Sequence, residues 1–226
     1  AAAGGLPTGR RSRPESRVVL SNGVRMPRLG LGTYGLGVGP ACTAAVRAAL
    51  EEGVRWVDTA PSYGNEREVG RALREAAEAG VTGGGRGEVF VSVKVADDDW
   101  GDVESSVEAS LSRLGLKTAD LLLLHHPKGI EETLSAWRAC ENLHRAGKVR
   151  ALGVCNFGLG DLKPLLHAAK VPVHAAQLKW SVHHQGAYVD PQGEAREVLR
   201  CCAQSRVQLI GVSLFNELFG EELAPL

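Results

Sequence analysis

The chain has 226 residues, of which 44% are hydrophobic and 23% are charged, and its formal net charge at pH 7 is zero. This length suits one substantial α/β domain or two small ones, and the neutral balance favours neither nucleic acid nor an anionic membrane as a partner. The longest apolar run, Leu121 to Leu124, is far too short to cross a bilayer and reads as a buried strand.

Residues 1–16 are rich in Ala, Gly, Pro and Arg and show no apolar periodicity, which predicts a disordered N-terminal arm. The remainder, 17–226, is expected to form the folded domain. The basic, acid-poor arm would also suit the remnant of an organelle transit peptide. We expect a cytoplasmic protein; a plastid or another organelle is the alternative if the arm is such a remnant.

From Arg17 onward the sequence alternates regularly. Asn22-Gly23 between apolar residues predicts a β-hairpin. Apolar strand segments then alternate with amphipathic helical segments in units of about 30 residues, the size of a βαβ repeat. We predict strands at 29–32, 54–58, 89–94, 120–124, 149–155, 173–177 and 208–212, and helices at 41–52, 66–79, 102–114, 131–146, 159–169 and 193–204.

Such repetition requires a parallel sheet, either an open doubly wound sheet or a closed eight-stranded barrel. Gly30, Gly32 and Gly35 match the letters of a dinucleotide fingerprint, and Asp58 ends the next strand as a ribose-binding acid would. However, the stretch 36–40 (Leu-Gly-Val-Gly-Pro) looks like a loop that no helix can include. We interpret the match as a loop that contacts a ligand through its backbone, and the doubly wound sheet remains the alternative.

The cysteine and histidine patterns favour neither disulfides nor a metal site. An odd number of cysteines without a C-x-x-C pair indicates reduced thiols in an intracellular compartment. His125-His126 and His183-His184 are adjacent pairs, whereas two helical ligands need a four-residue spacing. No metal site is predicted. The cysteines are Cys42, Cys140, Cys155, Cys201 and Cys202.

Ionisable residues stand at three consecutive strand ends: Asp58, Lys94 and His125. A polar strand end explains any one of them, but three in a row, with Tyr63 one loop away, suggest a site, because parallel strand ends lie about 5 Å apart. A nearby ammonium lowers the pKa of a Tyr, and a carboxylate keeps that ammonium charged. Tyr63 is therefore a candidate proton donor and His125 a candidate orienter of the accepting oxygen, which fits carbonyl reduction.

These residues resemble the aldo-keto reductase family. Residues 53–73, GVRWVDTAPSYGNEREVGRAL, are similar to the family signature around its catalytic Asp and Tyr. Residues 30–34, 121–127 and 147–157 are similar to its first strand, its His-bearing segment and its fifth strand, and the resemblance covers about 17–215. It implies an α/β TIM (β/α)₈-type barrel that reduces small aldehydes or ketones to alcohols with NADP(H). We expect a monomer whose partner is a small carbonyl substrate.

The resemblance also implies a role for each matching residue. The catalytic set would be Asp58, Tyr63, Lys94 and His125; the cofactor would be held by Gly32, Thr33, Asp58, Cys155, Asn156, Gln177 and Ser213; the substrate would be met by Tyr34, Trp100 and His126.

Several positions depart from the family pattern. Cys155 replaces the usual Ser, Ala176 replaces an Asn, and Val212 stands where an aromatic residue usually stacks on the nicotinamide. The seventh predicted strand ends close to Leu226, so we expect a barrel truncated after that strand and without the basic residues that meet the adenosine 2′-phosphate. The alternative function is a catalytically impaired barrel that acts as a binding or regulatory protein.

Overall fold

A computed structural model describes residues 16–83, 88–181, 185–186 and 195–214. The predicted hairpin is confirmed: β1 (Arg17–Val19) pairs antiparallel with β2 (Arg25–Pro27). In the connecting turn Gly23 has a φ of 86°, a left-handed conformation that costs glycine little. The predicted disordered arm lies outside the described residues, apart from Ser16.

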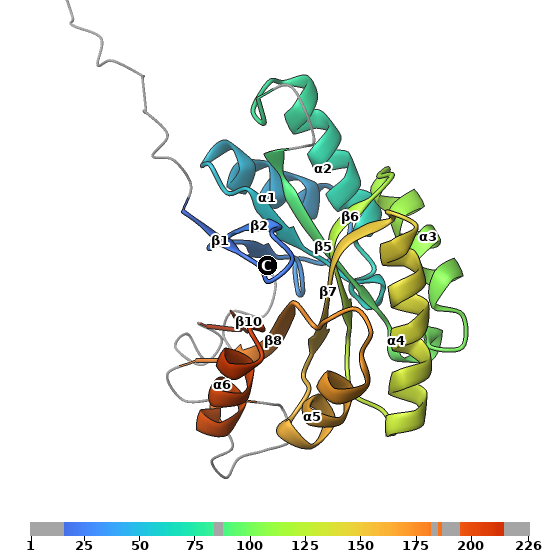
Figure 1. The fold of residues 1–226 in the computed structure, drawn as a ribbon. Coiled ribbons are helices and arrows are strands. Elements are labelled where there is room, and N and C mark those ends of the chain that lie inside the picture. The colour runs from blue at the N-terminus through green and yellow to red at the C-terminus, as the bar shows by residue number, and fades with distance from the viewer. Residues whose placement is uncertain (1–15, 84–87, 182–184, 187–194, 215–226) are drawn as a thin grey trace, which may run out of the picture.

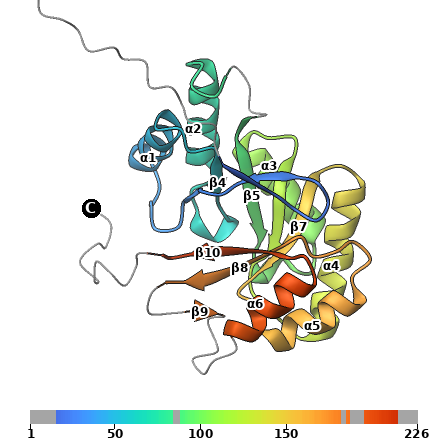
Figure 2. The same ribbon diagram turned by 60° about the vertical axis from the view of Figure 1, so that its left-hand side comes forward.

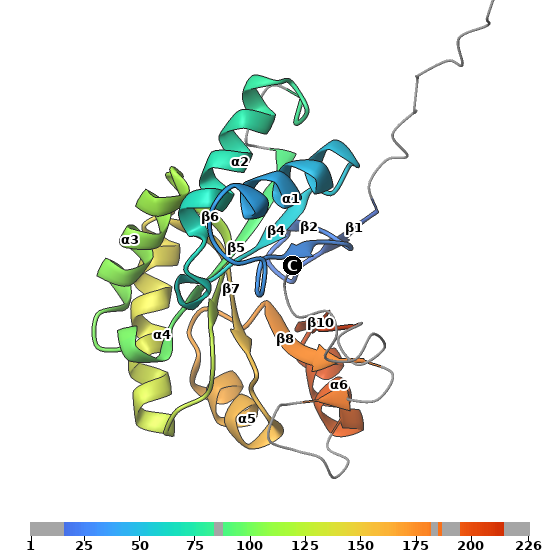
Figure 3. The same ribbon diagram turned by 180° about the vertical axis from the view of Figure 1, so that it is seen from behind.

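Seven parallel strands follow one another in the order β10-β8-β7-β6-β5-β4-β3. Figures 1 and 3 show them curving into a nearly closed barrel with the helices outside. A doubly wound sheet reverses its strand order at a switch point, so the unbroken order excludes that alternative. The strands are β3 (Leu31–Gly32), β4 (Trp56–Asp58), β5 (Phe90–Val95), β6 (Ala119–Leu124), β7 (Val149–Cys155), β8 (Ala175–Trp180) and β10 (Gln208–Val212), and a short β9 (Gln185–Gly186) pairs antiparallel with β8.

Within the described ranges, six α-helices connect or follow these strands: α1 (Pro40–Glu51), α2 (Glu66–Glu78), α3 (Val103–Leu114), α4 (Ile130–Arg145), α5 (Leu159–Ala168) and α6 (Ala195–Gln204). Two 3₁₀ turns that lie wholly within the described residues were not predicted, η1 (Pro61–Tyr63) and η3 (Asp97–Asp99). The predicted strand at 173–177 is displaced toward the C-terminus, and the start of the predicted helix at 193–204 lies outside the described residues.

The glycine-rich segment after β3 is a loop, as expected. Gly35, Gly37 and Gly39 all have positive φ values, of 79°, 66° and 90°, so the backbone there cannot be helical. One detail of the prediction is wrong, because Pro40 belongs to α1. Proline is well suited to the first position of a helix, where its missing N–H would have no partner. The dinucleotide fingerprint is therefore only a match of letters.

The barrel strands divide the core into two apolar layers. Leu122 and Leu124 of β6 face the helices, whereas Leu121 and Leu123 face the barrel interior, as alternation along a strand requires. The inner layer also contains three residues of the hairpin segment, and Asn22 Nδ2 donates to the carbonyl oxygen of Arg150 at the start of β7. The hairpin therefore covers the amino-terminal end of the barrel, and Figure 2 shows it lying across the strands. Its inner-layer residues are Leu20, Val24 and Met26.

Within the described residues, no helix has both the length and the apolar character needed to span a membrane.

Candidate active site

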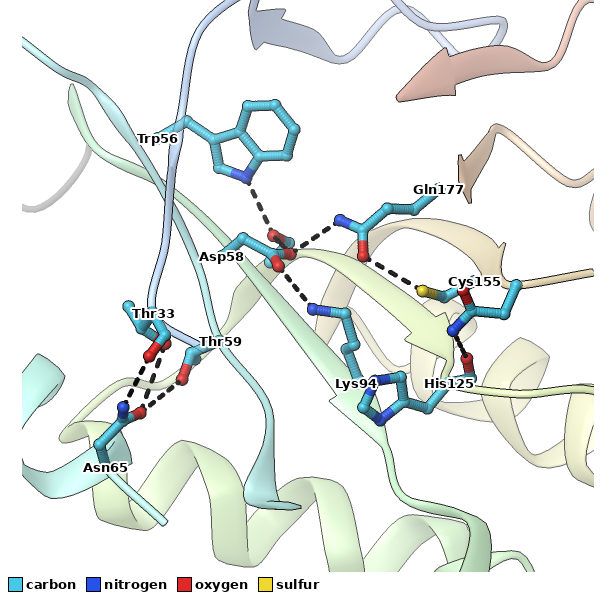
Figure 4. Close-up of polar contacts among 11 residues, drawn as sticks. Thr33, Trp56, Asp58, Thr59, Asn65, Lys94, His125, Cys155 and Gln177 are labelled. Carbon is cyan, nitrogen blue, oxygen red and sulfur yellow. Dashed lines mark hydrogen bonds and ion pairs between the residues drawn. The ribbon is translucent and has the colours of Figure 1, made fainter. Parts of the chain in front are cut away.

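A buried ion pair lies at the carboxyl end of the barrel. Lys94 Nζ is 2.5 Å from Asp58 Oδ2, and the two residues are only 1% and 6% exposed (Figure 4). Burial, the largest single influence, lowers the pKa of Lys94, but Asp58 and, to a smaller extent, Tyr63 and Cys155 together outweigh it, and the pKa stands above its usual value. The ammonium is therefore charged at neutral pH, as the sequence predicts.

Tyr63 lies beside this pair. It ends the 3₁₀ turn η1, and Lys94 Nζ is 5.0 Å from the centroid of its ring. Burial raises the pKa of the phenol; Lys94 lowers it, but by less, and Asp58 raises it further. Lys94 thus acts in the predicted direction, while the net shift is opposite to the one expected. The phenol consequently holds its proton throughout the neutral range.

His125 completes the cluster from the residue after β6. Its ring centroid is 5.9 Å from that of Tyr63, and its ring stacks on His126 at 4.4 Å. Burial, followed by the charge of Lys94 and the proximity of His126, lowers the pKa of His125 to about 4. The imidazole is therefore neutral at pH 7 and has one N–H to donate. His126 in turn is held by Asp97, with 3.1 Å between Nδ1 and Oδ2.

A second group of polar side chains comes from the end of β7, the residue that follows it, and β8; Figure 4 shows two of them, Cys155 and Gln177, beside the ion pair. Cys155 Sγ donates to Gln177 Oε1 over 3.2 Å, and Gln177 Nε2 donates to Asp58 Oδ1 over 3.2 Å. Asn156 Nδ2 donates to the carbonyl oxygen of His125 over 3.1 Å. Burial raises the pKa of Cys155 to about 12, so the thiol keeps its proton and can act as a donor.

Thr33 is fully buried and forms two hydrogen bonds with Asn65, one through its hydroxyl and one through its backbone carbonyl. Its Oγ1 donates to Asn65 Oδ1 over 3.3 Å, and Asn65 Nδ2 donates to the Thr33 carbonyl oxygen over 2.9 Å. Gly32 pairs in register with Asp58, which brings its backbone next to the ion pair. Ser213 directly follows β10 and has a φ of 57°. These three predicted cofactor residues stand on or after strands that end at the same rim.

The predicted substrate residues differ in their placement. Tyr34 is 75% exposed and packs edge-on against Tyr63, with 5.2 Å between the ring centroids, and His126 stacks on His125. Trp100 instead follows η3, packs against the outer apolar layer and lies under Lys128 Nζ at 5.4 Å. The contacts observed therefore bring two of the three to the catalytic cluster.

The sequence analysis missed three polar residues of the site. Ser92 Oγ donates to Asp58 Oδ1 over 2.5 Å, and Trp56 Nε1 donates to Ser92 Oγ over 2.9 Å. A signal for both was available: Ser92 stands two residues before Lys94 and Trp56 two before Asp58, hence on the same faces of their strands. Asn65 had no such signal, because its partner Thr33 follows another strand.

No group of three or more His, Cys, Asp or Glu side chains placed to hold a metal ion occurs in the described part of the chain.

Both the barrel and the cluster at its rim agree with the resemblance found in the sequence. The model of the aldo/keto reductase family matches residues 28–219. The chain belongs to the aldo/keto reductase family.

Named relatives point the same way. The uncharacterized oxidoreductase YtbE of Bacillus subtilis (strain 168) is 36% identical over 199 residues, which cover 86% of this chain and 66% of the relative. The glyoxal reductase of the same organism is 39% identical over 165 residues, covering 72% of this chain and 57% of the relative. The chain thus spans between about half and two thirds of the length of these curated relatives.

A solved structure extends the comparison to the cofactor. The aldo-keto reductase AKR2E5, crystallised in complex with NADPH, has a TM-score of 0.78 and 30% identity, covering 88% of this chain and 63% of that one. A nicotinamide cofactor is therefore bound by a structural neighbour with the same fold.

Proposed function

We propose that this protein reduces small aldehydes or ketones to alcohols, with NADPH as the hydride donor. The observation that carries the proposal is the protonated Tyr63 backed by the buried Lys94–Asp58 pair. Membership of the family and the names of its reductase relatives support the reaction class. A small carbonyl compound such as glyoxal is the substrate class that the similarity to glyoxal reductase suggests.

The residues of this chain supply the proton and steer it. NADPH, when bound, supplies the hydride that adds to the carbonyl carbon. Tyr63 gives its phenolic proton to the carbonyl oxygen as that oxygen gains negative charge, and the O–H bond of the alcohol forms as that of the phenol breaks. The charged Lys94 stabilises the resulting phenolate, and Asp58 keeps Lys94 in place.

His125 would orient the carbonyl. Its depressed pKa keeps the ring neutral, so that it donates an N–H to the carbonyl oxygen without competing as an acid. Tyr34 and His126, which contact Tyr63 and His125 respectively, would line the substrate pocket. Trp100 is proposed as a third lining residue on the strength of the resemblance.

The residues around the ion pair fit a nicotinamide cofactor. Asn156 and Gln177 are buried amides beside the cluster, and an amide offers the donor and the acceptor that a carboxamide needs. In the structure the Gln177 amide donates to Asp58 and accepts from Cys155, so both its N–H and its oxygen are directed toward the site. Gly32, Thr33, Cys155 and Ser213 would complete the cofactor site.

The test is NADPH oxidation with glyoxal or methylglyoxal, measured for the wild type and for Tyr63→Phe. We expect kcat of the variant to fall by about 10³-fold, within the range for loss of a general acid. The dissociation constant of NADPH should change little, because the phenol is not proposed to hold it. A variant that retains more than about a tenth of the activity would remove Tyr63 from the mechanism.

The second candidate is a barrel that binds its ligands without turnover. Val212 favours it, since an aliphatic side chain cannot stack on a nicotinamide ring as an aromatic one does. Tight NADPH binding by the wild type, with no oxidation in the presence of any small aldehyde, would decide for a binding or regulatory role.

A further inference from the structure

The Asp58 carboxylate is held by more than its ion pair with Lys94. Its Oδ2 faces Lys94 Nζ at 2.5 Å, while Oδ1 accepts from Ser92 Oγ at 2.5 Å and from Gln177 Nε2 at 3.2 Å. Three donors on two strands, β5 twice and β8 once, fix both the position and the rotation of this carboxylate. Ser92 is fully buried and so has no access to water as a substitute partner.

The direction of the Ser92 hydrogen bond is determined by its other partner. An indole N–H can only donate, so Trp56 Nε1 donates to Ser92 Oγ over 2.9 Å. A hydroxyl has a single proton, and that proton therefore remains free to point at Asp58 Oδ1. The chain of bonds runs from Trp56 through Ser92 to Asp58, and it matches the ionised form of the carboxylate.

Trp56 is itself immobilised by packing in the barrel interior. It is 6% exposed and meets Phe90 edge-to-face, with 6.0 Å between the ring centroids. Its ring also lies directly against the backbone of Gly30, where an added Cβ would come within 2.5 Å of the indole. The indole N–H is thus a fixed donor whose position is set by the inner apolar layer.

We propose that Ser92 and Trp56 are positioning residues that orient the Asp58 carboxylate and, through it, hold the Lys94 ammonium behind Tyr63. This assignment rests on the proposed function for its catalytic consequence. Neither residue touches the reacting atoms. Without the Ser92 hydroxyl the carboxylate can rotate, and the ammonium loses its fixed distance of 5.0 Å from the Tyr63 ring.

The effect should be visible at Tyr63 without any turnover. The charged or titratable groups facing this phenol are Lys94 from β5, Asp58 from β4, Cys155 from β7 and His125 after β6. Lys94 lowers the pKa of Tyr63 against the larger effect of burial, so a less firmly held ammonium lets the phenol titrate at higher pH.

The experiment follows each of the three tyrosines by NMR of ¹³Cζ-labelled protein across a pH titration, with Tyr63→Phe assigning the signal. Ser92→Ala should move the Tyr63 midpoint upward and lower kcat for aldehyde reduction by about tenfold, the effect of one hydrogen bond to a charged group. Ser92→Thr, which keeps the hydroxyl, should restore both. Trp56→Phe, which keeps the ring but removes the N–H, should give a smaller change of the same sign.

The matched control is Ser110→Ala, another buried serine, whose hydroxyl accepts from Arg113 on the outer helix α3 at 3.1 Å. It should leave the Tyr63 midpoint and kcat unchanged. If Ser92→Ala behaves like this control in both measurements, or if folded Ser92→Thr fails to restore the wild-type values, the positioning role is wrong. If Ser92→Thr does not fold, Trp56→Phe decides: an unchanged midpoint and kcat overturn the role.

The two proposals fail separately. A wild type without turnover, in which Ser92→Ala still shifts the Tyr63 midpoint, would overturn the proposed function and support the positioning of Lys94. A wild type that reduces aldehydes, together with a Ser92→Ala variant whose Tyr63 midpoint and kcat are unchanged, would support the proposed function and overturn the positioning role.

Discussion

The two halves of the site differ in how their polar groups are occupied. In the acid–base half, Asp58, Lys94 and Tyr63 already have the charges and the contacts that proton donation needs. In the other half, where the cofactor is proposed to bind, the amides of Gln177 and Asn156 already form hydrogen bonds with neighbours. Gln177 bonds to Asp58 and Cys155, and Asn156 bonds to the His125 carbonyl oxygen. The first half is therefore preorganised, while the second would have to exchange hydrogen bonds to bind a nicotinamide as proposed.

Gln177 is the link between the halves, because its amide bonds to Asp58 on one side and to Cys155 on the other. Moving this amide toward a carboxamide would leave Asp58 Oδ1 with Ser92 as its neutral donor. The Trp56–Ser92 chain thus keeps the acid–base half intact while the cofactor half rearranges. Substitutions in one half should then affect different quantities from substitutions in the other.

The largest effect is expected for Lys94→Met, which breaks the acid–base half. It should lower kcat by at least about 10²-fold by removing the charge behind Tyr63. It should also lower the free energy of unfolding by about 3–5 kcal/mol, because Asp58 is left buried without its counter-ion. Aldehyde-dependent NADPH oxidation and urea unfolding measure the two losses.

Lys148→Met is the control for this prediction. Lys148 pairs with Glu108 at 2.6 Å, but the two side chains are 40% and 52% exposed, and such surface pairs contribute only about 0–1 kcal/mol. Equal losses of stability in the two variants would contradict the assignment of Lys94 to a buried pair.

A smaller effect is expected at low pH, and it concerns the β7–β8 contact below the cofactor half. Nδ1 of the buried His174 accepts the Leu152 N–H over 2.9 Å, which requires a neutral ring, and burial together with His144 lowers the pKa of His174 to about 4. Because the folded pKa lies below the unfolded value, this stability is complete above about pH 6.5 and is lost as the pH falls toward 4. The loss should reach up to about 3 kcal/mol.

His174→Asn tests this, since an amide oxygen can accept the same N–H without titrating. Its urea midpoint should vary less between pH 7 and pH 5 than that of the wild type. His167→Asn, at an exposed position, should leave the pH dependence unchanged. An identical pH dependence in all three proteins would contradict the role given to His174.

The smallest effect is expected for Cys155→Ser, which changes a hydrogen-bond donor in the half where the cofactor is proposed to bind. A hydroxyl is a stronger donor than a thiol, so once Gln177 has exchanged its bond to residue 155, Ser should offer the cofactor a better hydrogen bond than Cys155 and tighten NADPH binding by about two- to fivefold. Fluorescence titration measures the dissociation constant. Cys140→Ser, a buried thiol on α4, should cost stability without changing that constant, and a weaker affinity in Cys155→Ser would refute the prediction.

The sequence predicted the parts of the molecule that depend on local patterns. Alternating strands and helices gave the barrel, and the placement of Asp58, Lys94 and His125 near strand ends gave the cluster. The net pKa shift of Tyr63 was not predictable, because it depends on burial, a property of the folded chain. Nor was the Thr33–Asn65 contact, which joins loops 32 residues apart.

The hairpin across the amino end of the barrel has a consequence for how Tyr63 would regain its proton in the proposed reaction. Lys94 is 1% exposed, and the inner apolar layer with its Leu20, Val24 and Met26 lies between the cluster and that end. Tyr63 is only partly buried at the opposite rim, so water can reach it from the side on which the substrate is proposed to bind. The phenolate left by each proton transfer is therefore expected to regain its proton through that opening, after the alcohol has left it.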